Sequence, residues 1–189
     1  MTTDRTSDIE SLPAALAAHL NRAFPDLVRA LQDDVFSGAL RMTGNRSDAE
    51  EITQETFVRA YRALGDYPAG RIGDLRLRGW VWTIAANLCR NRARARRRRP
   101  EEALPDAAPV LDTGPGPEQL ALGALERERL AAHLGALSWP MRSAVVLRHV
   151  VGLGYEEIAA VLERPAGTVK ADVHRGLGRL RDSLEEEQT

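Results

Sequence analysis

The sequence predicts an all-α protein in which two small helical modules are joined by a flexible linker. Ala, Leu and Arg, which favour helices, dominate the 189 residues, whereas aromatic residues make up only 5%. Apolar residues recur at helical spacing in two stretches, and a segment rich in proline and glycine separates them. We therefore divide the chain into a mobile leader (1–24) with a candidate short helix at LPAALAAHL, a first module (25–99), a linker (100–119), a second module (120–184) and a short tail (185–189).

Composition and spacing argue against several classes of protein. The single cysteine, Cys89, excludes an intrachain disulfide and a cysteine-based metal site, and the four histidines lack ligand spacing. No Ser/His/Asp set or phosphate-binding glycine loop is apparent, so we expect no enzyme activity and no cofactor. The N-terminus does not resemble a signal peptide, and no apolar run is long enough to span a bilayer. We expect a cytoplasmic protein without membrane insertion.

The first module is expected to contain three main helices. The first covers 26–43 and ends at Gly44-Asn45. Ser47 and Glu50 have the spacing of a capping box at the start of a second helix, over 48–64. The glycine-rich segment 65–79 predicts irregular structure, and a third helix then begins near Trp80.

The third helix has two faces of different chemistry. Apolar residues at i, i+3, i+4 and i+7 form a core face, namely Val81, Ile84, Ala85 and Leu88. The opposite side combines an aromatic ring, an amide and arginines, which suits base stacking, base-edge hydrogen bonds and phosphate contacts: Trp80, Thr83, Asn87, Arg90 and Arg94. Ordinary packing is the alternative for the tryptophan.

The end of this helix concentrates positive charge in a chain whose net charge is only −1. The stretch CRNRARARRRRP holds seven arginines between Arg90 and Arg99, and Pro100 ends it. The linker that follows has five carboxylates and no Lys or Arg. The arginine run is either a nucleic-acid contact or a solvated tail or localisation signal.

The second helix carries charge of the opposite sign. Asp48, Glu51 and Glu55 lie at i, i+3 and i+7 and form an acidic stripe beside Gln54. A stripe of this kind is either a solvated face or a docking surface for a basic partner.

The second module has the pattern of a helix-turn-helix. A short helix over 155–162 is followed by the turn ERPAG and by Thr168, a suitable N-cap for a second helix. The predicted buried stripe of that helix is Val169, Val173, Leu177, Leu180 and Leu184. The opposite side carries Ala171, Asp172, Arg175, Gly178 and Arg179, with Lys170 and His174 flanking them. A plain helical hairpin is the alternative.

In this order the motifs resemble the extracytoplasmic-function (group IV) sigma factors of bacterial RNA polymerase. TGNRSDAEEITQETFVRAYRAL is similar to the segment that docks on the polymerase, and GWVWTIAANLCRNRARARRR to the segment that melts and reads the minus-ten element. The segment from LSWPMRSAVVLRHV to VKADVHRGLGRLR resembles the region that reads the minus-thirty-five element. The resemblance covers roughly 25–99 and 120–184.

The resemblance implies an alternative sigma factor that binds core RNA polymerase and promoter DNA and is held by an anti-sigma factor. It assigns polymerase binding to Asp48, Glu51, Gln54, Glu55 and Phe57. It assigns the minus-ten element to Trp80, Trp82, Thr83, Asn87, Arg90 and Arg94. It assigns the minus-thirty-five element to Thr168, Lys170, Ala171, His174, Arg175 and Arg179.

Two points qualify this assignment. Many relatives carry Ser-Arg where this chain has Ala171-Asp172, so the resemblance does not specify its preference at minus-thirty-five. The rival function is a helix-turn-helix regulator of the response-regulator type, which acts without being a polymerase subunit. That class needs an α/β receiver domain or a ligand pocket upstream, and no alternating strand pattern is found here.

Overall fold

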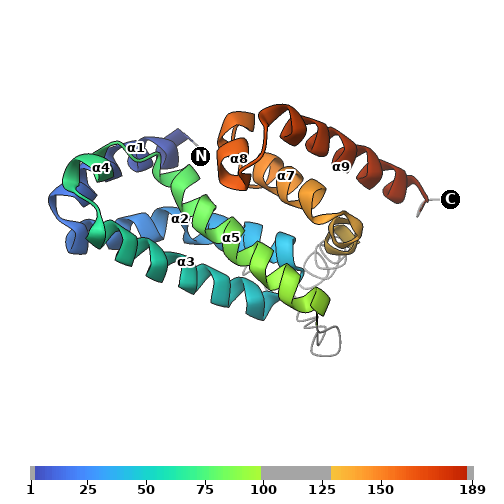
Figure 1. Ribbon diagram of the computed structural model, residues 1–189, viewed down its shortest axis with the longest axis horizontal. Coiled ribbons are helices and arrows are strands. Elements are labelled where there is room, and N and C mark those ends of the chain that lie inside the picture. The colour runs from blue at the N-terminus through green and yellow to red at the C-terminus, as the bar shows by residue number, and fades with distance from the viewer. Residues whose placement is uncertain (1–2, 99–128, 187–189) are drawn as a thin grey trace, which may run out of the picture.

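The computed structural model describes residues 3–98 and 129–186, and all regular structure in these ranges is helical, as predicted (Figure 1). The helices are α1 (Thr3–Ala18), α2 (Leu20–Thr43), α3 (Arg46–Asp66), α4 (Ala69–Gly73), α5 (Leu77–Arg98), α7 (Trp139–His149), α8 (Tyr155–Leu162) and α9 (Ala166–Glu186), and residues 129–136 are helical as well. No helix in the described ranges is long and apolar enough to cross a membrane. The predicted linker and the last three residues of the predicted tail lie outside the described residues.

The first module is a bundle in which α2, α3 and α5 pack against one another. Its core is built from the apolar stripe of each helix, with Leu27, Leu31 and Val35 of α2 fully buried. Cys89 of α5 lies in the same core, and burial raises the pKa of its thiol to about 12. The thiol therefore stays protonated at neutral pH and is not a reactive site.

The start of α3 differs from the predicted capping box. Asn45, not Ser47, is the N-cap, and its Oδ1 accepts a hydrogen bond from the backbone N–H of Asp48 at 2.8 Å. Ser47 lies inside the first turn of the helix. Asn and Ser cap equally well, so the sequence offered two neighbouring choices, and Gly44 in the left-handed conformation ends α2 immediately before Asn45.

The predicted leader contains a longer helix than the candidate LPAALAAHL segment, followed by the start of α2. Residues Thr3–Ala18 form α1, which packs against α2 and α4. Leu12 and Leu16 are buried at 7% and 1% exposure, so α1 is anchored by apolar side chains. The segment 65–79 is also more regular than expected, because α4 and the start of α5 occupy part of it.

The second module contains the predicted helix-turn-helix, formed by α8 and α9, with α7 packed against both. The helix α9 begins at Ala166, so Thr168 lies within its first turn and is not the cap. The backbone N–H of Thr168 donates to the carbonyl of Pro165 at 2.9 Å. The buried stripe of α9 is also shorter than predicted, because Leu177 and Leu184 are exposed.

A glycine replaces the missing part of this stripe. A Cβ at Gly176 would lie only 2.7 Å from Cγ2 of Val145. The close approach of α7 therefore explains a residue that would otherwise weaken the helix. Leu177 was predicted to face inward, but Gly176 takes that position and its backbone packs against α7.

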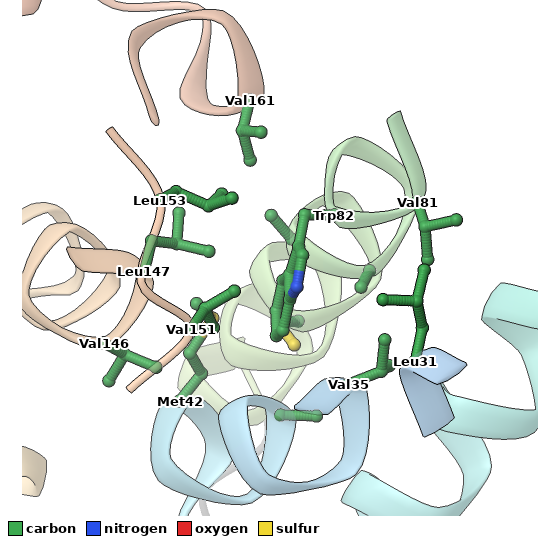
Figure 2. Packing of buried hydrophobic residues seen from close by; sticks show 14 of the residues in the cluster. Leu31, Val35, Met42, Val81, Trp82, Val146, Leu147, Val151, Leu153 and Val161 are labelled. Carbon is green, nitrogen blue, oxygen red and sulfur yellow. The ribbon is translucent and has the colours of Figure 1, made fainter. Parts of the chain in front are cut away.

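The two modules pack directly against each other through α5 with α8 and α2 with α7 (Figure 1). Trp82 of α5 lies at the centre of this contact, with Val151 and Leu153 of the second module on one side and Val35 of α2 near the other (Figure 2). Its side chain is fully buried. A Cβ at Gly38 would collide with the indole ring, which explains the small residue there.

Two arginines link the modules by hydrogen bonds to backbone carbonyls. Arg78 donates to the carbonyl of Val151 and pairs with Asp34 at 3.2 Å. Arg142 donates to the carbonyl of Met42 at 3.0 Å. In the described structure, the second module therefore covers part of α5.

Candidate polymerase and promoter-DNA interface

The acidic stripe on α3 divides into exposed and buried positions. Glu51 and Gln54 are exposed and Glu55 is half-buried, so these three can meet a partner. Asp48 and Phe57 are buried, at 8% and 7% exposure. The aromatic ring therefore stabilises α3 from within the bundle, and any docking surface is built from the other residues.

Part of the acidic stripe is already paired within the chain. Arg96 of α5 contacts Asp48 at 2.8 Å between Nη2 and Oδ2, and Arg92 lies 3.5 Å from the other carboxylate oxygen. Arg92 also forms an ion pair with Glu51. The pairs tie the C-terminal half of α5 to the start of α3. Each pair also partly neutralises the positive charge of α5 and the negative charge of α3.

Glu55 has no such partner on α5. It forms an i, i+4 ion pair with Arg59 at 2.6 Å on the surface of α3. Exposed pairs of this kind contribute about 0.3–0.5 kcal/mol. Glu55 can therefore exchange its intrahelical partner for an external one at small cost, whereas Asp48 cannot.

The arginine run consequently has two sides. Arg92 and Arg96, four residues apart, face α3. Arg94 lies about 200° further round the helix from Arg92 and is exposed. Arg90 donates to Oδ1 of Asn87, so the half-buried amide and guanidinium are held together on the side that Arg94 also occupies.

The two tryptophans assigned to the minus-ten element occupy different environments. Trp80 is half-buried and meets Tyr67 edge-on, with ring centroids 6.1 Å apart. It shares a side of α5 with Thr83, whose hydroxyl donates to the carbonyl of Gly79 at 3.0 Å. Trp82 lies under the second module (Figure 2), so it can reach DNA only if the two modules separate.

The helix α9 presents most of its predicted DNA-reading residues to solvent. Lys170, His174, Arg175 and Arg179 are exposed, whereas Thr168 and Ala171 are half-buried. The pattern leaves one basic side of the helix open while Val169 and Val173 pack inward. An α-helix with these side chains fits a major groove.

A buried ion-pair network on α9 was not predicted from the sequence. The carboxylate of Asp172 is only 4% exposed, and it binds Arg164 at 2.5 Å and Arg175 at 2.7 Å. The spacing of Asp172 and Arg175, i and i+3, was a signal for the second pair. The first pair joins the turn to the helix, and helical periodicity does not report contacts of that kind.

Comparisons with known proteins match both modules to one family. Residues 27–99 match Sigma-70 region 2, and residues 127–180 match Sigma-70, region 4. Among curated proteins, the ECF RNA polymerase sigma factor SigE of Mycolicibacterium smegmatis is 39% identical over 96% of this chain, and the match spans 65% of that longer protein. The ECF RNA polymerase sigma-E factor of Escherichia coli is 33% identical over 82% of each chain.

Solved structures share the arrangement of helices. CnrH, solved in complex with the cytosolic domain of CnrY, is 27% identical and covers 95% of this chain and 98% of its own, with a TM-score of 0.72. RpoE of Bartonella quintana, solved with the anti-sigma factor NepR, is 24% identical and covers 86% and 96%, with a TM-score of 0.67.

The order of the matched regions decides between the two functions that the sequence left open. A regulator of the response-regulator type shares only the C-terminal helix-turn-helix, whereas here a region 2 match precedes the region 4 match. The regulator is therefore not favoured. The chain belongs to the extracytoplasmic-function family of RNA polymerase sigma factors.

Proposed function

We propose that this sigma factor binds core RNA polymerase through α3 and reads promoter DNA with α5 and α9. Residues 25–99 would act as region 2 and residues 120–184 as region 4. The polymerase would perform the chemistry, and this chain would contribute recognition and melting of the promoter in the cytoplasm.

The observation that carries the proposal is the division of charge on α5. Arg92 and Arg96 are held by α3, while Asn87, Arg90 and Arg94 lie outside that contact. Guanidinium groups outside an ion pair can contact phosphates, and an amide can read a base edge. The same helix thus holds the module together on one side and offers DNA-binding groups on the other.

Two substitutions on this side of α5 are expected to fail differently. Asn87→Ala should lose discrimination at one base of the minus-ten element, at a cost of about 1–3 kcal/mol if a bidentate contact is removed. Arg94→Ala should weaken all promoters alike and lower the slope of log K against log salt by about one. Permanganate footprinting of the holoenzyme, with salt titrations, measures both effects.

Arg29→Ala is the matched control, because it removes an exposed arginine from α2 instead. It should leave opening and salt dependence unchanged. If Asn87→Ala and Arg94→Ala both behave like this control, this side of α5 does not contact DNA, and its arginines are a solvated surface.

An anti-sigma partner is also part of the proposal. CnrH, which shares the fold over nearly the whole chain, was solved bound to a segment of a second protein. The exposed apolar residues Val150 and Leu177 of the second module would suit such a contact. Co-purification from the source organism should recover an inhibitor as well as polymerase, and repeated recovery of polymerase alone would argue against the partner.

A further inference from the structure

The turn of the helix-turn-helix and the recognition helix α9 are joined by one buried carboxylate. Asp172 is 3% exposed, although Asp is a residue type that is seldom fully buried unless it is paired. Both of its oxygens are engaged: Oδ2 by Nη1 of Arg164 and Oδ1 by Nη2 of Arg175. Removing either arginine would leave the buried carboxylate of Asp172 with only one positively charged partner.

One partner of this carboxylate belongs to the turn. Glu163, the C-cap residue that follows α8, adopts a left-handed backbone conformation with φ 53°. A non-glycine residue is uncommon there and needs support from its surroundings. Arg164 follows directly, and its backbone N–H donates to the carbonyl of Ala159 at 3.0 Å. The pair of Arg164 with Asp172 therefore fixes the turn against α9.

The other partner points toward the proposed DNA-binding side. The side chain of Arg175 is 57% exposed although Asp172 binds one end of it. A guanidinium has five N–H donors in a planar fork, so one contact with Asp172 leaves donors for a second ligand. Holding an arginine in one orientation lowers the entropy lost when it binds a base or phosphate.

We infer that Asp172 is a positioning residue that orients Arg175 for the minus-thirty-five element. The inference rests on the proposed function, in which α9 reads that element. A buried carboxylate cannot itself approach a phosphate, so Asp172 acts through the arginine that it holds. The chain thus uses an acidic residue to set specificity at a position where many relatives carry a basic one.

The test measures sequence preference by the full holoenzyme. Promoters with a constant minus-ten element and randomised minus-thirty-five bases are bound competitively, and the bound fraction is sequenced. Arg175→Ala should reduce the preference at the bases that it reads about tenfold. Asp172→Asn, which retains the size of the side chain, should reduce preference at the same bases, and the double variant should be no worse than Arg175→Ala alone.

Asp182→Asn is the matched control, because this carboxylate is exposed on the same helix. It should leave the preference unchanged. Thermal unfolding and holoenzyme formation are measured in parallel. If the Asp172→Asn protein does not fold, Asp172→Glu is used in its place. The longer side chain keeps the charge but displaces the carboxylate, so it should alter preference at the same bases.

The results distinguish the reading of DNA by α9 from the positioning of Arg175 by Asp172. If Arg175→Ala leaves the preference intact, α9 does not read DNA through this residue and that part of the proposed function is wrong. If Arg175→Ala changes the preference but the folded Asp172 variant only lowers thermal stability, Asp172 is structural and the inference is overturned. An additive loss in the double variant would likewise overturn it.

Discussion

Replacing Trp82 with alanine should lower the free energy of unfolding by about 3–5 kcal/mol, the usual cost of deleting a buried aromatic side chain. The indole is fully buried between the two modules (Figure 2), and a Cβ at Gly38 would collide with it. The interior around the indole is close-packed, so the neighbouring helices would have to shift to fill the cavity that the substitution leaves. Urea denaturation followed by circular dichroism measures the change.

Trp80→Ala is the control for this substitution. Trp80 is half-buried, and its edge-on contact with Tyr67 is worth about 0.5–1.5 kcal/mol beyond the area that it buries. The loss of stability should therefore be clearly smaller than for Trp82→Ala. Equal losses for the two variants would contradict the central position of Trp82 in the packing.

Reversing the charge of Glu55 should weaken association with core polymerase about 100-fold, as expected when like charges are forced together at an interface. Glu55→Lys loses only the surface pair with Arg59, so the fold should persist. Glu51 is less suitable for this test, because its pair with Arg92 also joins α3 to α5. A pull-down with immobilised core enzyme measures the affinity.

Asp26→Lys is the matched control. Asp26 lies on α2 and also forms a local surface pair, with Arg29, and its side chain is 52% exposed against 40% for Glu55. It belongs to another helix and is not part of the acidic stripe. Similar binding by Asp26→Lys and Glu55→Lys would show that the stripe does not dock on polymerase.

The elements of this fold were predictable where the signal is local. Apolar periodicity and the segment rich in proline and glycine predicted the three main helices of the first module and the helix-turn-helix of the second, but neither α4 nor α7. Local signals left the caps ambiguous. Asn45 and Ser47 are equally good caps, and the carbonyl of Pro165 accepts the first hydrogen bonds of α9, so this helix begins ahead of Thr168.

What could not be predicted depends on contacts between distant segments. The period of α5 identified Val81 as a core residue but gave no reason to place Trp82 beneath the second module. The acidic stripe and the arginine run were read as separate surfaces, yet Arg92 and Arg96 join them. In α9, only the approach of Val145 explains why Gly176 takes the inward position.

The most direct test of the account is run-off transcription from the genomic DNA of the source organism. Core polymerase is supplied alone, with this protein, or with its Glu55→Lys variant, and the 5′ ends of the transcripts are mapped. We expect discrete start sites only with the unaltered protein, each preceded by shared minus-thirty-five and minus-ten elements. Start sites that are the same with core polymerase alone would contradict the assignment of this chain as the subunit that selects promoters.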